Sequence, residues 1–335
     1  MPKRSRIEWL NPDTDMKAQP IGRRRFLTIS ALGAGAAFLR PSALTGEEDS
    51  RGDLRFAIVS DVHLRYRPDE YDCPPASVSL PEERHAAFLR AAADWGADVV
   101  IDLGDLQPRS FTEGPGKQAL EAWRAWPKEK IAVFGNHDDD FLPKETYLRE
   151  MGMPAAFYSK TVKGRTFIVL DSGDPAIAPG TAGADWGQEQ LPWLRDEIDK
   201  APGHCVILIH HGTEPGRANL PPERLQAVID KANETAGHNK VAACFRGHLH
   251  RTAVNHSRGV YHVLVNSASY RWVRGHGPVF YRDPSPWAMG SLSSTGVIRL
   301  QGTGRPGNWA ADCERTPGEV LPADELTYQK SIPPA

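Results

Sequence analysis

The stretch LRFAIVSDVH, residues 54–63, decides the fold. Residues 54–60 are mainly apolar and predict a buried strand, which ends directly before Asp61 and His63. The same arrangement, an apolar run followed by metal-capable side chains, occurs four more times along the chain. Because an open α/β sheet binds its ligands beyond the carboxyl ends of the strands, we expect all five segments to meet at one rim.

The other four strands end in residues of the same kind. Residues 97–103 lead into Gly104-Asp105, and residues 130–134 lead into Gly135-Asn136-His137-Asp138. Residues 205–209 lead into His210-His211, and residues 241–245 lead into Gly247-His248-Leu249-His250. Strand and helix patterns alternate from residue 54 to residue 250, which predicts an α/β fold.

The side chains at these strand ends suit transition metals. Asp and His supply the oxygen and nitrogen donors that Zn, Mn and Fe accept. In Asp-x-His and His-x-His, two side chains lie on the same side of an extended segment. The Gly before Asp105, Asn136 and His248 lets the backbone turn sharply and approach an ion closely. The seven donors exceed the needs of one four-coordinate ion and suit two; they are Asp61, His63, Asp105, Asn136, His210, His248 and His250.

In this order, the five blocks resemble the calcineurin-like metallophosphoesterase family, and the resemblance covers residues from about 55 to 265. It implies a four-layer αββα sandwich, in which two packed mixed sheets are flanked by helices. It also implies a binuclear site. One ion would be held by Asp61, His63 and His250, the other by Asn136, His210 and His248, and Asp105 would bridge the two.

Hydrolysis of a small phosphorylated substrate is the activity that the resemblance implies. Two ions about 3.5–4 Å apart lower the pKa of a shared water, and the bridging hydroxide attacks phosphorus. The candidate catalytic residues are His137 and Asp138. The resemblance implies that His137 lies beside the substrate. There it would stabilise the transition state or protonate the leaving group. Asp138 either orients His137 or lies in a surface turn. The sequence does not choose between phosphomonoesters and phosphodiesters.

Two other classes of function remain as alternatives. A non-catalytic scaffold on the same fold would tend to lack metal ligands, whereas none of the seven donors is missing here. A mononuclear metal hydrolase of another bond would leave several donors unexplained. Taken alone, Asp61 and Asp105 would equally suit the N-caps of helices that follow strands.

Several nearby residues have two interpretations. The family usually uses the first residue of the His210-His211 pair, which makes His211 a neighbour of the metal or of the substrate. Arg65 and Arg109 either grip phosphate or are solvated charges. Asn266 and Ser267 end another strand and are candidates for the rim. The aromatic residues of a Gly/Pro-rich loop, residues 266–290, either form a pocket wall or pack the loop; they are Tyr270, Trp272, Phe280, Tyr281 and Trp287.

Composition excludes several classes of protein. The 335 residues carry a net charge of −2, which does not indicate a nucleic-acid binder. Hydrophobic residues make up 40% and charged residues 24%, as in ordinary folded domains rather than disordered chains. The chain contains no apolar run of about 18 residues or more, so we expect no stable membrane span. We assign residues 47–301 to the metallophosphoesterase domain and residues 302–335 to an irregular C-terminal tail.

The N-terminal segment, residues 1–46, resembles a twin-arginine export signal. Arg23 and Arg24 form the pair, Phe26-Leu27 follow, and an apolar stretch of about 14 residues is too short to span a bilayer. The alternative is a surface helix with a basic start. We therefore expect a partnership with the twin-arginine machinery and a periplasmic or extracellular location. Of the four Cys, we expect Cys205 and Cys244 to be buried as small hydrophobic side chains.

Overall fold

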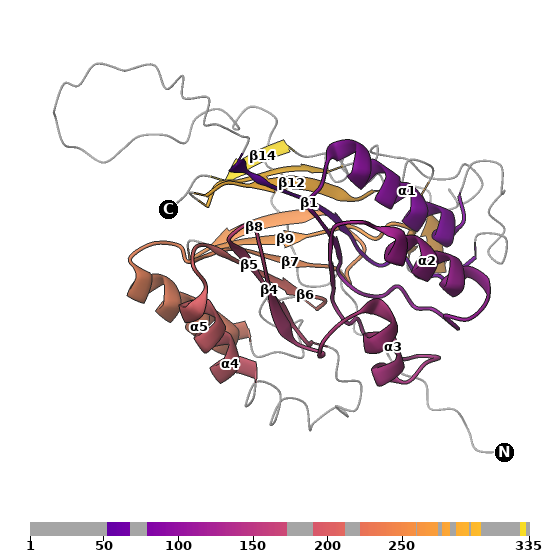
Figure 1. The fold of residues 1–335 in the computed structure, drawn as a ribbon, viewed down its shortest axis with the longest axis horizontal. Helices are drawn as coiled ribbons and strands as arrows, with labels where there is room; N and C mark the ends of the chain where they lie inside the picture. Colours follow the sequence, from indigo (N-terminus) through magenta and orange to yellow (C-terminus); the bar gives the residue numbers. More distant parts are fainter. Residues whose placement is uncertain are drawn as a thin grey trace. The chain divides into compact units, whose positions relative to one another are not determined.

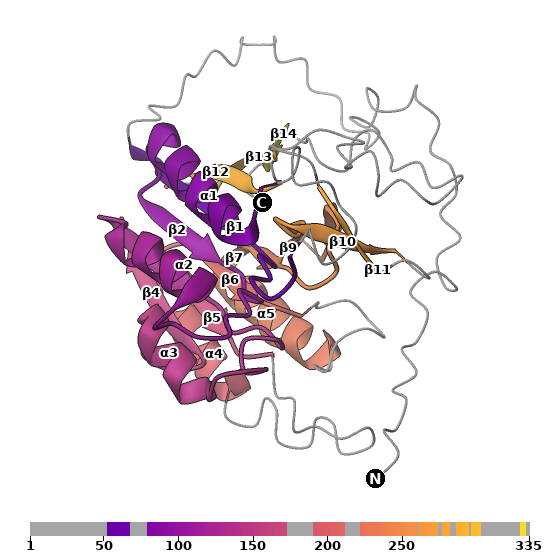
Figure 2. The same ribbon diagram turned by 90° about the vertical axis from the view of Figure 1, so that its right-hand side faces the viewer.

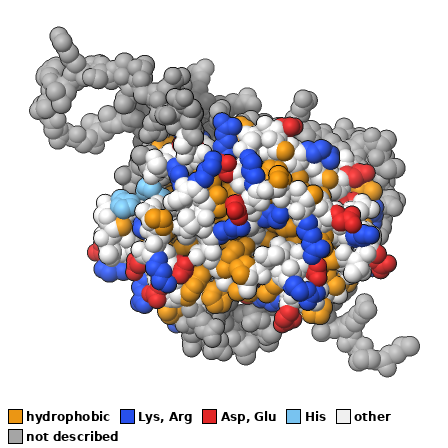
Figure 3. Space-filling view, in the orientation of Figure 1, with side chains coloured by type: hydrophobic (Ala, Val, Ile, Leu, Met, Phe, Trp, Pro, Cys, Tyr) orange, Lys and Arg blue, Asp and Glu red, His pale blue; other side chains and the backbone are white. Residues whose placement is uncertain are grey.

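The computed structural model describes residues 52–67, 79–172, 190–211, 222–258, 260–273, 277–281, 286–294, 296–302 and 329–332. The predicted export signal lies outside these residues, as do Cys73 and Cys313. In the described part of the chain, no helix combines the length and the hydrophobicity that crossing a membrane requires. Figure 3 shows acidic and basic side chains interspersed over one face of the protein, in keeping with its net charge of −2.

Two six-stranded mixed sheets form the centre of the described structure (Figure 1). The first sheet has the order β14 (Gln329–Ile332), β13 (Ile298–Gly302), β12 (Ala288–Leu292), β1 (Leu54–Val59), β2 (Val99–Asp102) and β3 (Glu129–Ala132). The second has the order β4 (Tyr158–Val162), β5 (Arg165–Leu170), β6 (Cys205–Ile209), β7 (Val241–Arg246), β9 (Val260–Leu264) and β8 (Ala253–Ser257). Strands β1 to β3 are parallel, and so are β5, β6, β7 and β9.

Helices cover the outer faces of both sheets (Figure 1). The first sheet is covered by α1 (Pro81–Trp95) and α2 (Gly114–Ala125), and α3 (Lys144–Met151) packs against α2. The second sheet is covered by α4 (Gln190–Lys200) and α5 (Pro222–Ala236). These layers confirm the predicted four-layer αββα sandwich.

The second sheet is buried on both faces, because successive side chains of a strand point to opposite sides. In β5, Phe167 and Val169 join the hydrophobic core between the sheets. Ile168 and Leu170 instead pack with Ile198 of α4, in a second core beneath the helices. Cys205 and Cys244 also lie in this second core with free thiols, as small buried hydrophobic side chains.

The structure corrects the sequence analysis in two segments. Within residues 266–290, expected to form a loop, β10 (Tyr270–Val273) pairs with β11 (Gly277–Phe280), and β12 joins the first sheet. Within the tail expected to be irregular, β14 pairs with β13 and completes the edge of that sheet. The sequence of β12 does not resemble a typical strand because it contains Gly290. Only glycine fits there, since a Cβ atom would lie 2.3 Å from the ring of Phe56. Figure 2 shows the β10–β11 hairpin beside β9 and the end of β1.

Phe56 joins the two sheets, and its removal tests this packing. Its side chain is fully buried, and its ring contacts that of Phe245 on β7 in an edge-to-face arrangement with centroids 5.8 Å apart. We expect Phe56→Ala to lower the free energy of unfolding by about 3–5 kcal/mol, because a cavity remains between the sheets. Urea unfolding would measure this change. Lys117→Ala, on the exposed face of α2, should change stability by less than about 0.5 kcal/mol. Equal stability of the two variants would contradict the packing described here.

Candidate metal centre

Two groups of metal-capable side chains lie at the carboxyl ends of strands from both sheets. Asp61, His63 and His250 form one group, and Asp105, His210 and His248 form the other. Within each group, the candidate ligand atoms lie within 4.8 Å of one another. The first sheet supplies both carboxylates and His63, whereas the second sheet supplies the three remaining imidazoles. Packing of the two sheets therefore assembles the site.

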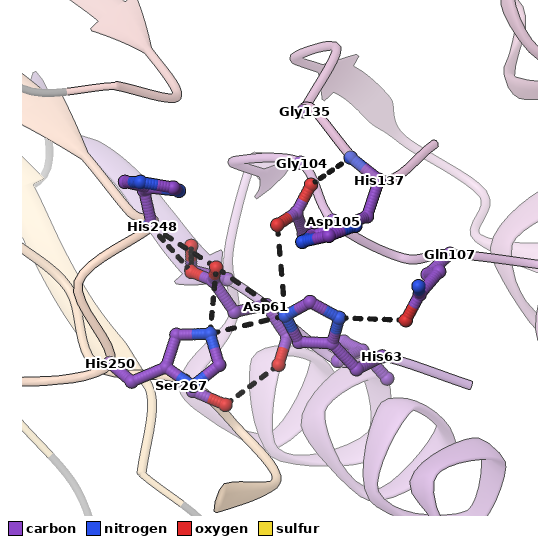
Figure 4. A network of polar contacts seen from close by, with 12 residues as sticks. Asp61, His63, Gly104, Asp105, Gln107, Gly135, His137, His248, His250 and Ser267 are labelled. Atoms are coloured by element: carbon purple, nitrogen blue, oxygen red, sulfur yellow. Dashed lines mark hydrogen bonds and ion pairs between the residues drawn. The ribbon is translucent and has the colours of Figure 1, made fainter. Parts of the chain in front are cut away.

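The first group is compact and buried (Figure 4). The Nε2 atom of His250 lies 3.3 Å from Oδ1 of Asp61, and that of His63 lies 3.8 Å from the same oxygen. The two Nε2 atoms are 3.1 Å apart. Asp61 itself is fixed by its neighbours, since its carboxylate accepts hydrogen bonds from the hydroxyl of Ser60 and the backbone N–H of His248.

Asp105 lies between the two groups. Its Oδ2 atom is 3.2 Å from Nε2 of His210 and 3.7 Å from Nε2 of His63. Its other oxygen accepts a hydrogen bond of 2.9 Å from the backbone N–H of His137. Asp105 thus has the placement that a bridging ligand requires.

The imidazole rings of the site are held so that Nε2 faces inward. His63, His210 and His250 each point Nδ1 at an oxygen that accepts its N–H. The acceptors are Oε1 of Gln107 at 2.9 Å, the carbonyl of Leu103 at 2.8 Å and the carbonyl of Tyr270 at 2.9 Å. Because Nδ1 carries the hydrogen in this arrangement, the lone pair of each neutral ring is on Nε2.

The donor set fits metal cations. The Nε2 atoms of His63 and His250 lie 3.1 Å apart beside a buried carboxylate, so either a hydrogen or a metal cation must lie between them. The buried Oδ1 atom of Asn136 has no hydrogen-bond partner, although the residues on either side of Asn136 contact Asp105. Imidazole nitrogens, carboxylates and an amide oxygen together suit Zn, Mn or Fe.

The electrostatics of the site reflect competition between burial and attraction. Burial opposes the charged form of Asp61, but His250 and the other imidazoles outweigh it and hold the pKa of Asp61 well below its usual value. Burial likewise opposes protonation of His210, but Asp105 outweighs it and raises the pKa of His210 to about 10. A metal at Asp105 therefore competes with a proton on His210, so that its binding would release protons.

Left-handed backbone conformations aim these side chains. Three pairs of residues, each separated by one residue, have positive φ: 51° and 48° at Asp61 and His63, 59° and 51° at Asp105 and Gln107, and 71° and 48° at His248 and His250. The expectation of extended segments is therefore wrong for these residues. These positive-φ residues bend the chain away from the extended course of the strands, and the candidate ligand atoms of Asp61, His63 and His250 lie within 4.8 Å of one another. Each such non-glycine residue costs of order 1 kcal/mol.

Glycines let the backbone approach the carboxylates of the site. A Cβ atom at Gly135 would lie 2.2 Å from Oδ1 of Asp105. A Cβ at Gly247 would lie 2.6 Å from Oδ2 of Asp61. Neither distance is possible for a real side chain, so any larger residue must displace a carboxylate of the site.

Asp138 differs from its predicted role. Its buried carboxylate accepts backbone N–H groups from Asp105, Gly135 and Gln107, at 3.0, 2.8 and 2.9 Å. The ring of His137 is held instead by Asp140, whose Oδ2 lies 2.9 Å from Nδ1. Asp138 therefore fastens the loops after β2 and β3 together, because a buried carboxylate with three backbone donors is satisfied where it stands.

The structure shows where His211, Arg65 and Arg109 lie, the residues that had two interpretations in the sequence. The ring centroids of His211 and His248 are 4.3 Å apart, and Nδ1 of His211 forms a hydrogen bond with the hydroxyl of Ser172. His211 does not belong to either group of metal-capable side chains. Arg65 and Arg109 lie over the rings of Tyr66 and Phe141, at 5.6 and 5.1 Å from the ring centroids.

Residues of the segment 266–281, for which the sequence offered a place at the rim or in a pocket wall, support the site by hydrogen bonds and ring contacts. Ser267 donates to the carbonyl of Asp61, and Asn266 accepts from Tyr281. The ring of Tyr270 lies 4.7 Å from that of His250, and its carbonyl holds the same imidazole. Gln107, Asp140 and Tyr270 have no motif of their own; only Gln107 and Asp140 carry a signal, their closeness in sequence to two of the blocks.

Known proteins place this chain among metal-dependent phosphoesterases. The family model described as calcineurin-like phosphoesterase matches residues 54–252, more than half of the chain. The protein belongs to this family. A comparison with curated proteins gave no match.

The solved structures that share its fold include two with low sequence identity to this chain. One is a dimetal phosphatase from Danio rerio, with 14% identity and a TM-score of 0.54, covering 75% of this chain and 96% of the other. The second is GAP50, described as the anchor in the inner membrane complex of Plasmodium, with 14% identity and a TM-score of 0.50, covering 83% of this chain and 90% of the other. The same fold therefore occurs in an enzyme and in an anchor protein, and the side chains at the rim must decide between such roles.

Gly135→Ala tests the close approach at Asp105. The added Cβ must displace the carboxylate, so we expect metal affinity to fall about 10-fold or more. Calorimetric titration with Zn²⁺ or Mn²⁺ would measure the affinity. Gly203→Ala is the matched control, since a Cβ there would have its nearest neighbour at 3.6 Å. Unchanged affinity in a folded Gly135→Ala variant would show that the approach is not required.

Proposed function

We propose that the protein is a binuclear metal-dependent hydrolase of phosphate esters. The observation that carries this proposal is the position of Asp105, within 3.7 Å of imidazoles from both groups of metal-capable side chains. Membership of the calcineurin-like phosphoesterase family supports metal-dependent phosphoester hydrolysis.

The proposed ligands divide according to this geometry. We assign Asp61, His63 and His250 to one ion, and Asn136, His210 and His248 to the other, with Asp105 shared between them. Support for Asn136 comes from its buried, unpartnered Oδ1 atom. As a neutral donor, Asn136 also limits the negative charge that an anionic substrate meets at the site.

When bound, such ions activate a water molecule for attack on phosphorus and offset the charge of the phosphoryl oxygens. The protein supplies the surroundings for that reaction. Backbone N–H groups and a hydroxyl fix Asp61 and Asp105, so that these carboxylates need no rearrangement during the reaction. His137 is half-buried beside Asp105 and is the group we assign to the leaving oxygen. The substrate is a small phosphomonoester or phosphodiester.

A scaffold function is the second candidate, because the fold also occurs in an anchor protein. The complete donor set at the rim favours the enzyme. A mononuclear hydrolase of another bond would leave one of the two groups without a role.

Metal content and turnover test the proposal together. We expect about two transition-metal ions per chain by mass spectrometry, because each group supplies at least three donors. Bis(nitrophenyl) phosphate and nitrophenyl phosphate serve as the diester and the monoester, each with and without chelator. One ion per chain would contradict the binuclear site. A metal-loaded protein that hydrolyses neither ester would favour the scaffold.

Asp105→Ala tests the shared ligand. We expect loss of both ions and a fall in kcat/KM beyond the roughly 10–100-fold cost of losing an outer-shell partner. Asp102→Asn is the control on the same segment. Burial, reinforced by Asp138, raises the pKa of Asp102 well above its usual value, so asparagine mimics the neutral acid and keeps the bond from Gly104. Retention of both ions and activity by Asp105→Ala would refute the assignment.

We also propose that the protein is exported by the twin-arginine machinery to the periplasm or the extracellular space. The support is the Arg23-Arg24 pair with Phe26-Leu27 after it. This machinery carries folded proteins, which suits a site assembled from two packed sheets.

Replacement of the arginine pair tests export. We expect Arg23→Lys with Arg24→Lys to leave the chain in the cytoplasm of a bacterium with intact twin-arginine machinery, as judged by cell fractionation. Arg4→Lys with Arg6→Lys makes an equal chemical change outside the motif and should be exported normally. Normal export of the first double variant would remove this proposal and leave the enzymatic one untouched.

A further inference from the structure

A hydrogen bond joins two loops beside the proposed metal site. Nε2 of Gln107, in the loop after β2, donates to Oδ2 of Asp140, in the loop after β3, at 2.7 Å. The same carboxylate oxygen lies 2.9 Å from Nδ1 of His137, and Oε1 of Gln107 lies 2.9 Å from Nδ1 of His63. Figure 4 shows Gln107 and His137 on the same side of His63. The two loops therefore form one flank of the site.

An apolar ring is exposed on this flank. Phe141 directly follows Asp140, about 3.8 Å away between Cα atoms, and has an exposed fraction of 43%. It is the only large hydrophobic side chain that lies exposed in the part of the chain that the structure describes. The next residue, Leu142, packs against the core between the sheets, so the loop already has an apolar anchor. Packing among the described residues does not account for the ring of Phe141, whereas a ligand on this flank would cover it.

The ring of Phe141 lies beneath a guanidinium group. The Cζ atom of Arg109 is 5.1 Å from the ring centroid of Phe141. Arg109 is two residues beyond Gln107, and Phe141 is one residue beyond Asp140, so this contact extends the hydrogen-bonded pair away from the metal-capable side chains. Aromatic rings and guanidinium planes both offer flat faces on which planar π systems stack. Together, Phe141 and Arg109 are a flat surface of this kind.

Local charge favours a neutral ring over a second phosphate at this surface. The carboxylates of Asp139 and Asp140 directly precede Phe141, and Asp140 is exposed. An anionic group at Arg109 would be repelled by these carboxylates. A neutral aromatic group would meet no such repulsion and would still gain from the positive charge of Arg109.

We propose, on the basis of the proposed function, that Phe141 and Arg109 form a subsite for a planar aromatic group of the substrate. With the phosphoryl group at the metal centre, the organic part of the ester extends along the flank formed by Gln107 and Asp140, and its ring stacks on Phe141. The preferred substrates are phosphate esters of alcohols that carry an aromatic ring several bonds away from phosphorus. The subsite contributes to affinity, because the ring lies apart from the bond that breaks.

Phosphonates that differ in a single ring test the subsite. In these probes a carbon atom replaces the ester oxygen, so the metal-loaded protein binds them without hydrolysis. A series from benzylphosphonate to phenylbutylphosphonate moves the phenyl ring stepwise away from phosphorus, and each member has a cyclohexyl analogue that is apolar but lacks a π system. At one chain length, we expect calorimetry to show about 3–10-fold tighter binding of the phenyl probe than of its analogue.

Four variants assign this preference to the two side chains. Phe141→Ala should lower the affinity for the best phenyl probe about 5–100-fold, with metal content and methylphosphonate binding unchanged. Phe141→Tyr keeps an aromatic ring and should keep the preference. Arg109→Ala should lower the affinity about 2–5-fold, as expected for an exposed cation–π contact. Arg55→Ala is the matched control and should bind as the wild type, since its guanidinium lies over Trp95 at the opposite end of β1.

The probes separate this inference from the proposed function. No preference for the phenyl ring at any chain length, or a preference that survives Phe141→Ala, would overturn the subsite. If the metal-loaded protein neither binds methylphosphonate nor hydrolyses the nitrophenyl esters, the proposed function fails. The comparison of phenyl and cyclohexyl probes in the wild type and Phe141→Ala would then still decide whether this surface binds aromatic groups.

Discussion

Two carboxylates, Asp61 and Asp105, are buried where strands of both sheets end, and the rest of the site compensates for that burial. An isolated buried charge is very unfavourable, so it must be surrounded by donors or cations. The protein supplies a serine hydroxyl, backbone N–H groups and four imidazoles. The nitrogen atoms of these imidazoles converge beside the carboxylates, where positive charge is held either as protons or as metal ions. Metal binding is therefore the state in which this group of side chains is balanced.

This constraint also couples the site to the fold. The acids belong to the first sheet and most of the imidazoles to the second, so neither sheet holds an ion with a full set of ligands by itself. Contacts such as that between Phe56 and Phe245 hold the sheets together. Ions that bind only to the packed arrangement stabilise the interface between the sheets as well as the site.

The sequence predicted the strands that end in ligands because each is a continuous apolar run followed by a polar block, as at residues 205–211. The sequence did not predict features that depend on contacts between residues far apart in the chain or on the conformation of a loop. Strand β12 contains Gly290 because Phe56, far away in sequence, fills the space beside it. Tyr270 supports His250 through a backbone carbonyl, which any residue type possesses. Asp138 and Asp140 lie two positions apart in a run of acids, and only the conformation of the loop shows which one reaches His137.

The residues of the rim with positive φ supply metal-capable side chains but lower the stability of the fold. Six residues of the rim occupy a left-handed conformation that glycine adopts without steric cost. Replacement of such a residue by glycine would relieve strain while it deletes a donor, so loss of catalysis can accompany a more robust fold. The metal-capable side chains of the rim are thus held at a cost in backbone strain that a protein of this fold without such side chains would not carry.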